Sequence, residues 1–356
     1  MEFKYLISGI DTLECAYYLA PSVEKHLDFD WLGFEKENLR QSKGKPSKVI
    51  TLGNSEFFLR PYGSSSGYPF VIENEHFIIS FGEFNNPNFF VKFKSVALWH
   101  EGPQILHQQF LTWASSIGYT PLQDERLSRV DTAFDYYIPE IDFCEDNIVS
   151  LSKKDSRHRQ DRKLQTLTFG KGDIVLRIYD KVAEIEEKSK KTWFFKLWGE
   201  EENVWRIELQ VRKPVLKRFG IRNFQDLAER QGDLLRYLVS EHSTMRRACA
   251  DRNRSRWPLH LLWVDLQVQV DSFCGLGVHR EFDYVALLEE KVIRNAISIY
   301  GYTKQMAALK CVKHKQTDIE FYDAMKYLYR KVKQVHNQFS WEIDVEKKIN
   351  KIRLEQ

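Results

Sequence analysis

Three short segments of the chain place charged or phenolic side chains at every second position. They read RVDTAFD at residues 129–135, IVLRIYDK at 174–181 and WRIELQVR at 205–212. Side chains on a β-strand alternate between its two faces, so residues two apart point the same way. Each segment is therefore predicted to be a strand with an apolar back and a polar front. The predicted fronts carry Arg129, Asp131, Ala133 and Asp135, then Arg177, Tyr179 and Lys181, and finally Arg206, Glu208, Gln210 and Arg212.

These residue types are the ones that metal-assisted chemistry on a phosphate needs. Carboxylates that converge can hold Mg²⁺ or Mn²⁺, which prefer oxygen ligands and polarise a phosphate. The planar guanidinium groups of Arg129, Arg206 and Arg212 suit the oxygens of a phosphate. A half-exposed antiparallel sheet gives the same alternation without any such site. Three consecutive strands with acids or a tyrosine beside arginines nevertheless favour a metal-and-phosphate site.

Tyr179 is the candidate nucleophile of that site. A phenol with an ordinary pKa of about 10 is a poor nucleophile until its anion is stabilised. Arg177 and Lys181 share its strand face and are predicted to stabilise that anion. Glu184 follows in a helix predicted to begin near residue 180, where it could approach the metal or pair with Lys188 at helical spacing.

Basic residues gather in two segments that could contact a phosphate backbone. Residues 211–260 contain twelve Lys and Arg against five Asp and Glu, although the net charge of the whole chain is only +3. A second basic segment lies at 153–163. Such patches are typical of proteins that bind nucleic acid, and they also occur as ordinary solvated surface. The candidates for DNA contact in these segments are Arg157, Arg159, Arg246 and Arg247.

The elements that must position these residues are strands first and helices later. Apolar or alternating runs at 48–52, 57–60, 70–72, 77–81 and 89–93 are separated by turn signals such as GSSSGYP and NNPN. A helix is predicted over 103–117, with Gly118 just past its end. The pattern becomes helical after Pro214, with helices predicted at 283–300 and 318–335.

This order of elements predicts an α+β fold, with an antiparallel-sheet catalytic core and a helical C-terminal region. We expect an N-terminal β-rich subdomain over residues 1–120 and a catalytic subdomain over 121–260. The helical region would cover 261–356. We see no run of about 18 apolar residues and no signal-peptide core, so a cytoplasmic protein without a membrane partner is expected. The five cysteines are scattered and form no CxxC pair, which argues against a disulfide framework and a structural zinc site.

Taken in order, the segments SRVDTAFDY, LTFG, LRIYDKVAE and WRIELQVR resemble the Rep_trans family of replication initiation factors. These motifs lie at roughly residues 126–212. GIDTLECAYYL and VKFKSVALW resemble the N-terminal part of the same family. No one motif is decisive, because each is short, but the four occur in the family's order.

The resemblance implies a rolling-circle initiator, as in staphylococcal-type plasmids and some filamentous phages, or a conjugative relaxase of the same family. It implies a metal-dependent nicking-joining enzyme that cuts one strand at an origin and later rejoins it. The cut would leave a 3′-OH and a 5′-phosphotyrosine on Tyr179. The implied metal ligands are Asp131 and Glu208, with Asp135 less firmly matched, and the implied cofactor is Mg²⁺ or Mn²⁺. The implied fold is distantly related to that of HUH nucleases.

The chain contains no His-x-His pair, so the metal ligands cannot be that pair of HUH nucleases. It also lacks a phosphate-binding Walker motif, so it should not unwind DNA by itself. The expected partners are double-stranded origin DNA, single-stranded DNA, and a host helicase and polymerase. The C-terminal helices could select the origin, form a homodimer or contact the helicase.

Two other functions remain open, and a third is disfavoured. A hydrolytic nuclease could use Asp131, Asp135 and Glu208 with water as the nucleophile, and a DNA-binding repressor could use the basic helical segment alone. A tyrosine recombinase is disfavoured because the sequence has no His-x-x-Arg.

The aromatic cluster at Trp193, Phe194, Phe195 and Trp198 could stack unpaired bases or could simply form part of the hydrophobic core.

Overall fold

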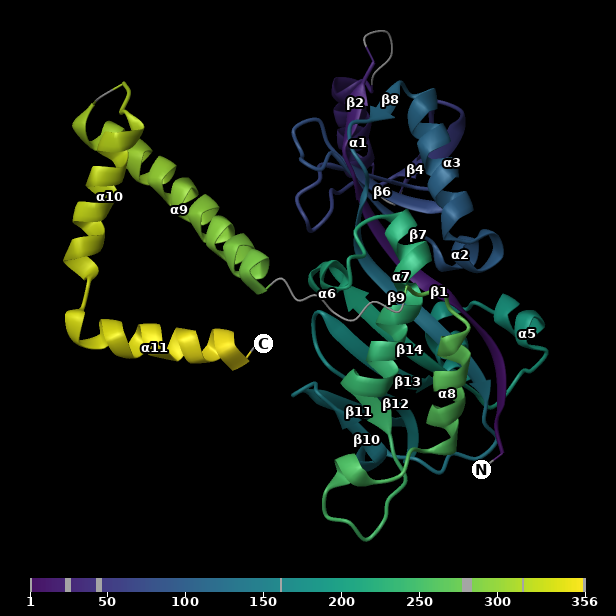
Figure 1. Cartoon of the computed structure of the whole chain (residues 1–356). Helices are drawn as coiled ribbons and strands as arrows, with labels where there is room; N and C mark the ends of the chain where they lie inside the picture. The colour runs from purple at the N-terminus through teal and green to yellow at the C-terminus, as the bar shows by residue number, and fades with distance from the viewer. Residues whose placement is uncertain are drawn as a thin grey trace. The chain divides into compact units, whose positions relative to one another are not determined.

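The computed structural model describes residues 2–22, 27–42, 47–160, 162–276, 284–315 and 317–354. It divides into two units, Met1–Arg280 and Glu281–Gln356. The first unit is built on one 11-stranded antiparallel sheet, in the order β11-β12-β13-β14-β9-β1-β7-β6-β5-β4-β3 (Figure 1). The α+β class and the antiparallel sheet are as predicted.

Most strands of this sheet begin and end close to the predicted runs, but no strand was predicted for β1 or β11. They are β1 Lys4–Tyr17, β3 Lys48–Leu52, β4 Ser55–Leu59, β5 Phe70–Glu73, β6 Phe77–Phe81, β7 Phe89–Phe93, β9 Arg126–Tyr137, β11 Asp155–Gln160, β12 Lys163–Phe169, β13 Ile174–Asp180 and β14 Val204–Arg212. Two small sheets pair β2 Leu19–Pro21 with β8 Tyr119–Pro121, and β10 Ile148–Ser150 with β15 Ser243–Met245.

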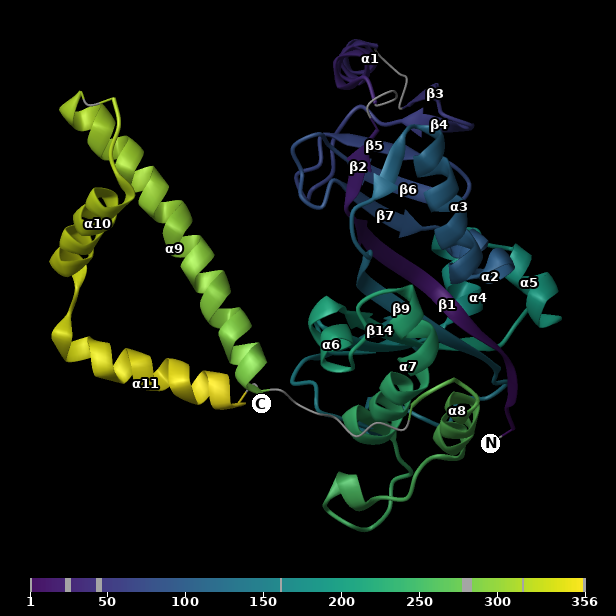
Figure 2. The ribbon, with the colours of Figure 1, turned by 45° about the horizontal axis from the view of Figure 1, so that its top comes forward.

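β1 is the strand that joins the two halves of the sheet, and the sequence reading had not identified it. It runs between β7 and β9 and so links the N-terminal strands to the strands that carry the predicted polar fronts (Figure 2). Its pairing with β9 slips at three places, between Tyr5 and Ile7, between Ile10 and Thr12, and between Glu14 and Cys15. Each slip is an irregularity of the bulge type, which breaks strict alternation. An acidic, glycine-containing stretch with broken alternation does not read as a strand.

Helices cover the apolar face of the sheet. α3 (Pro103–Ser116) packs Phe110 and Trp113 against Phe57 and Phe89 of the N-terminal strands. α7 (Phe224–Tyr237) and α8 (Leu261–Asp271) lie over β9 and β14 in Figure 1, and residues of all four elements share one core cluster. The other α-helices among the described residues of this unit are α1 (Phe29–Gln41), α2 (Ser95–Glu101), α4 (Lys181–Glu184), α5 (Trp193–Trp198) and α6 (Lys213–Arg218).

α8 belongs to the first unit and not to the C-terminal region in which it was predicted. Trp263 is completely buried, and its indole nitrogen donates to the carbonyl of Val239 at 2.7 Å. Tyr136 of β9 donates its hydroxyl to Asp265 at 3.0 Å. The 11-stranded sheet also contains strands from both sides of residue 120, because β1 pairs with β7 on one side and with β9 on the other.

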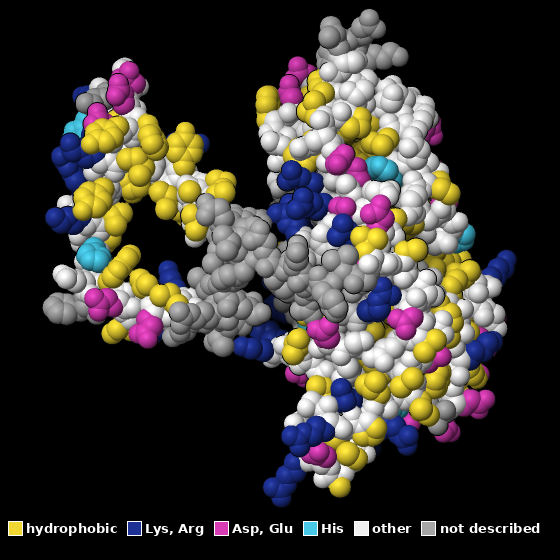
Figure 3. All heavy atoms as spheres, viewed as in Figure 1, with side chains coloured by type: hydrophobic (Ala, Val, Ile, Leu, Met, Phe, Trp, Pro, Cys, Tyr) yellow, Lys and Arg dark blue, Asp and Glu magenta, His cyan; other side chains and the backbone are white. Residues whose placement is uncertain are grey.

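The second unit is helical, as predicted for the C-terminal region. It contains α9 (Tyr284–His314), α10 (Phe321–Val335) and α11 (Gln338–Leu354). α9 continues through Gly301, where the prediction ended it, and residue 283 lies outside the described residues. Tyr300 and Phe321 pack edge to face between α9 and α10, but many apolar side chains of these helices stay at the surface (Figure 3). Among the described residues, no helix has the length and apolar character to span a membrane.

Candidate active site

One face of the central strands brings together the side chains that the alternation had placed on three separate fronts. Arg206, Glu208, Gln210 and Arg212 of β14 lie directly opposite Asp135, Ala133, Asp131 and Arg129 of β9. On the other side of β14, Arg177 pairs with Glu208 and Tyr179 pairs with Arg206. Directly opposed residues in an antiparallel pair share a face. The three polar fronts are therefore one continuous surface.

Tyr179 and Glu208 are in direct contact at the centre of this surface. The Tyr179 hydroxyl donates to Glu208 Oε2 at 2.9 Å. Arg177 Nη1 holds the other oxygen of Glu208 at 2.6 Å, and its Nη2 donates to Gln210 Oε1 at 3.0 Å. Glu208 is thus oriented from two sides, and one of its oxygens is within reach of the phenol proton.

The phenol of Tyr179 is neutral at rest. Burial raises the pKa of Tyr179 well above its usual value, and the nearby negative charge of Glu208 raises it further. The positive charge of Arg206 opposes both effects. Lys181, predicted to stabilise the anion, instead lies over the ring at 5.7 Å from its centroid and pairs with Glu184 at 2.5 Å. Glu184 therefore contacts Lys181, which is neither of the two roles predicted for it.

Asp131 lies beside this pair, held by Arg129. Arg129 grips both carboxylate oxygens of Asp131, with Nε at 2.8 Å from Oδ1. The pKa of Asp131 is raised to about 6. Burial is the largest cause and the negative charge of Glu208 adds to it, while the hydrogen bonds from Arg129 act in the opposite direction. That mutual repulsion means that Asp131 and Glu208 are electrostatic neighbours. Glu14 of β1 lies 3.8 Å from Arg129 and adds a further carboxylate at the edge of the site.

Asp135 and Arg206 form a buried structural pair and not the metal ligand and phosphate clamp that were predicted. Both side chains are 0% exposed. Arg206 donates to the two oxygens of Asp135 at 2.6 and 2.8 Å and to Asp11 of β1 at 2.8 Å. Trp198 donates to Asp135 at 2.9 Å. Both side chains are completely buried, and both oxygens of Asp135 and every Arg206 nitrogen have partners, so neither side chain is accessible to a ligand.

Aromatic side chains seal this pair from solvent. The guanidinium of Arg206 lies 4.6 Å from the ring centroid of Phe194 and 5.3 Å from that of Trp99. Phe194 and Trp198 are buried, and Phe194 stacks on Trp193 at 3.8 Å. The segment 193–198 was predicted either to stack unpaired bases or to pack in the core, and these contacts fit core packing. Trp99 lies against β1 at Gly9, where a Cβ would come within 2.9 Å of the indole.

With Asp135 excluded, Asp131 and Glu208 are the predicted metal ligands that remain. Among the described residues, no three His, Cys, Asp or Glu side chains are grouped so that they could hold a metal ion. The predicted set of Asp131, Glu208 and Asp135 is therefore not assembled. Asp131 and Glu208 still lie on one face, with Gln210 opposite Asp131. Their carboxylate oxygens already accept hydrogen bonds from Arg129, Tyr179 and Arg177, so a bound metal would have to replace these donors. Two carboxylates fit Mg²⁺ or Mn²⁺, because Mg²⁺ keeps several waters and completes its shell with phosphate oxygens.

The basic residues predicted to contact DNA fall into two groups. Arg157 and Arg159 are exposed on the edge strand β11, where both pair with Glu145, and Arg212 and Arg247 are also exposed. Arg246 instead holds the loop that follows β15, donating to Trp257 O at 2.6 Å and to Thr244 Oγ1 at 3.0 Å. The first group is available to a phosphate backbone and Arg246 is not.

Asp11, Glu14 and Trp99 are site residues that the sequence reading missed. Trp99 and Ser95 each donate to Asp11 at 2.9 Å, which ties α2 to β1. Asp11 stands at the register slip between Ile10 and Thr12 of β1, so an alternation rule places it wrongly. The sequence signal that could have indicated Asp11 and Glu14 is the occurrence of two acids within the largely apolar stretch GIDTLEC.

Residues 110–230 match the family model Phage_CRI, which describes the N-terminal part of a replication-associated protein. Asp131, Tyr179 and Glu208 all lie within the matched residues. The match confirms the predicted similarity to Rep-type replication initiators, through a family model other than the one that the motifs resembled. The solved structure of a rolling circle replication initiator protein from Geobacillus stearothermophilus is similar over 77% of this chain and 98% of that chain, with 18% identity and a TM-score of 0.42. No curated protein sequence matches the chain.

The buried pair makes a stability prediction. Arg206→Met leaves the carboxylate of Asp135 buried without its charged partner, which should lower the free energy of unfolding by about 3–5 kcal/mol in urea denaturation. Arg159→Met removes an exposed arginine from β11 and should change it by less than about 1 kcal/mol. Equal stability of the two variants would contradict the structural role of Arg206.

Asp131 makes a pH prediction for the protein in chelating buffer. Its pKa is about 6 in the folded chain and about 3.8 as an ordinary carboxyl, so the folded state binds this proton more tightly. The free energy of unfolding should therefore fall as the pH rises from about 4 to about 6, by on the order of 2–3 kcal/mol. Asp131→Asn should lack that fall, measured as the difference between two series of urea denaturations. Parallel pH profiles for the two proteins would be evidence against the raised pKa.

Proposed function

From the match of residues 110–230 to replication-associated proteins, we propose that this chain is a DNA nicking-joining enzyme that initiates rolling-circle replication. The observation that carries the proposal is the hydrogen bond from the Tyr179 hydroxyl to Glu208, on a sheet surface shared with Asp131. A nucleophile, a proton acceptor and a second carboxylate are the groups that phosphoryl transfer to a tyrosine requires.

The proposed reaction is a transesterification at one phosphodiester of the origin. Tyr179 gives its proton to Glu208 Oε2, and the phenolate oxygen forms a bond to the scissile phosphorus. The bond from phosphorus to the 3′-oxygen breaks. That oxygen receives the proton from Glu208, relayed by a water molecule, which leaves a free 3′-OH and returns Glu208 to its carboxylate form. The 5′-phosphate stays on Tyr179. In the reverse reaction a 3′-OH attacks the phosphotyrosine and the strand is rejoined.

The surrounding residues would help in defined ways. Arg177 fixes the orientation of Glu208 through its 2.6 Å contact, and Arg206 lowers the pKa of Tyr179 by its positive charge. Asp131 and Glu208 would hold Mg²⁺ or Mn²⁺, which polarises the phosphate when bound. The exposed guanidiniums of Arg157, Arg159 and Arg212 would contact the DNA backbone.

The protein would act on DNA and together with host replication proteins. Double-stranded origin DNA and the single strand released by the cut would be its substrates. A host helicase would unwind the duplex, because the sequence has no phosphate-binding Walker motif of its own. A host polymerase would extend the 3′-OH.

The nucleophile can be tested with supercoiled plasmid carrying candidate origin DNA, in Mg²⁺ or Mn²⁺, on denaturing gels. The wild-type protein should leave a covalent protein–DNA adduct, and Tyr179→Phe should leave none because it lacks the attacking oxygen. Tyr137→Phe, a change at the end of β9, is the matched control and should form the adduct. If Tyr179→Phe still nicks the DNA and neither protein forms an adduct, a hydrolytic nuclease replaces the proposal.

The proton acceptor can be tested in the same assay. Glu208→Gln preserves the shape of the side chain but cannot take the phenol proton, so adduct formation should slow by roughly 10²- to 10⁴-fold. Raising the pH should partly restore the rate of this variant, because hydroxide can deprotonate Tyr179 in place of Glu208. A wild-type rate in Glu208→Gln would exclude Glu208 as the base.

A further inference from the structure

We propose that the sheet surface carrying Tyr179 continues into a track for single-stranded DNA, which ends in a cavity beside Tyr62. The inference rests on the proposed function, because the strand in the track would be the one that Tyr179 cuts. It assigns a nucleic-acid contact to the N-terminal strands β3 to β7.

The strand pairing makes the two regions one surface. Arg129 beside the catalytic acids lies opposite Glu14 of β1, which in turn lies opposite Lys92 of β7. The same row continues through Ile78, Glu73 and Phe58 on β6, β5 and β4. Directly paired residues share a face, so this row runs without a turn from the catalytic face to the outer face of the N-terminal strands. The helix α3 packs on the opposite face.

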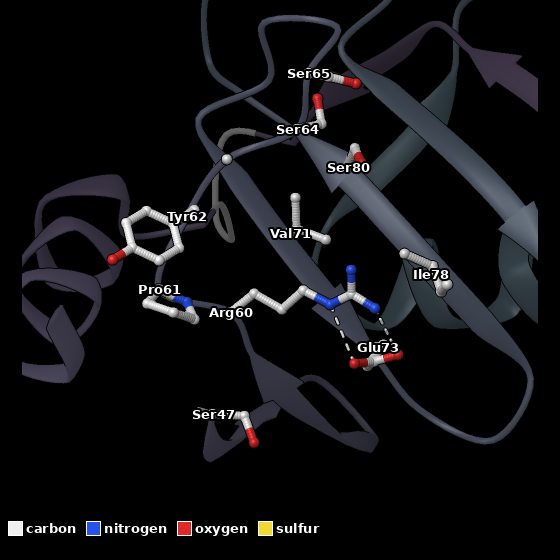
Figure 4. Close-up of a pocket in the computed structure, with 11 residues that line it drawn as sticks. Ser47, Arg60, Pro61, Tyr62, Ser64, Ser65, Val71, Glu73, Ile78 and Ser80 are labelled. Atoms are coloured by element: carbon white, nitrogen blue, oxygen red, sulfur yellow. Dashed lines mark hydrogen bonds and ion pairs between the residues drawn. The ribbon is translucent and has the colours of Figure 1, made fainter. Parts of the chain in front are cut away.

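A cavity of about 700 Å³ lies at the far end of this row, between the outer face and the loop after β4. Arg60, Tyr62, Ser64, Ser65 and Ser80 contribute its polar lining. Figure 4 shows the Arg60 guanidinium reaching across the strands to Glu73, with the serine hydroxyls above it. The volume is in the range of sites that hold a small organic group such as a nucleotide.

Arg60 is positioned to bind a phosphate. Glu73 accepts from Nε at 3.1 Å and lies 3.0 Å from Nη2. The third nitrogen, Nη1, points away from Glu73 in Figure 4. Lys94 also reaches Glu73, at 3.3 Å, so two cations surround one acid. The two positive charges around one acid, and the Nη1 group that points away from Glu73, suit an anionic backbone.

Two aromatic side chains stand at the surface where bases would stack. Tyr62 is 68% exposed, and Arg40 lies over its ring at 5.4 Å from the centroid, which holds the ring in place. Phe58 is 49% exposed in the row itself. Exposed aromatics beside a cationic surface are the arrangement that binds single strands without regard to sequence. A duplex hides its bases, so these rings favour a single strand.

The distance sets the length of DNA that the track needs. From β13, which carries Tyr179, to β5 there are six steps between neighbouring strands. At about 4.8 Å a step this is roughly 29 Å. A strand that reaches both Tyr179 and the cavity must be longer than one that occupies the catalytic face alone.

The test measures binding of fluorescein-labelled oligothymidines of about 4 to 16 nucleotides, by anisotropy with the full-length protein. Wild-type affinity should rise with length and level off once the oligonucleotide spans the track. Tyr62→Ala should weaken binding of the longest oligonucleotide roughly 5- to 100-fold. Phe34→Ala, which removes an exposed aromatic from α1, is the matched control and should bind like the wild type. Thermal unfolding of each variant verifies that it is folded.

Two results would overturn the inference: affinity that does not rise with length, or a folded Tyr62→Ala protein that binds the longest oligonucleotide as tightly as Phe34→Ala. Either result leaves the proposed function standing if the wild-type protein still forms its adduct with origin DNA. Absence of any wild-type adduct would count against the proposed function alone, since oligothymidine binding does not depend on cleavage.

Discussion

The ion pair of Arg206 with Asp135 is the interaction on which the candidate active site depends. Removing two charges from water is costly unless each is fully compensated, and here the guanidinium meets Asp135 and Asp11 while aromatic rings exclude water. The three partners come from β14, β9 and β1, so the pair fixes the register of these strands beside Tyr179. It also puts a positive charge next to a phenol whose pKa burial would otherwise raise further.

The second organising constraint is the continuity of the sheet. β1 pairs with β7 on one side and β9 on the other, and it carries Asp11 toward Arg206 and Glu14 toward Arg129. The N-terminal strands are therefore built onto the catalytic strands and share their apolar core. A division of this unit near residue 120 would cut through paired strands.

Much of this arrangement could be predicted from the sequence, because strand alternation is a local property. The polar fronts of β9, β13 and β14 follow directly from spacing, and their pairing places Tyr179, Glu208 and Asp131 on one face. Burial and partner choice are not local. Arg206 and Glu208 both sit on a polar front, and only the packing of Trp99 and Phe194 distinguishes a sealed structural arginine from a residue at the site. Asp11 could not be predicted either, because the register slips of β1 arise from its pairing with β9 and are not visible in the sequence of β1 alone.

The resting state of Tyr179 has a consequence for the protein between reactions. Its hydroxyl is a neutral donor to a carboxylate, with little tendency to ionise. In the proposed function, such a side chain is chemically latent, and the protein can meet the excess of unrelated DNA in a cell without joining itself to it. Reactivity would then arise only when a correctly placed phosphate accepts charge from the oxygen as the proton leaves, so that commitment to a site and activation of the nucleophile are one event.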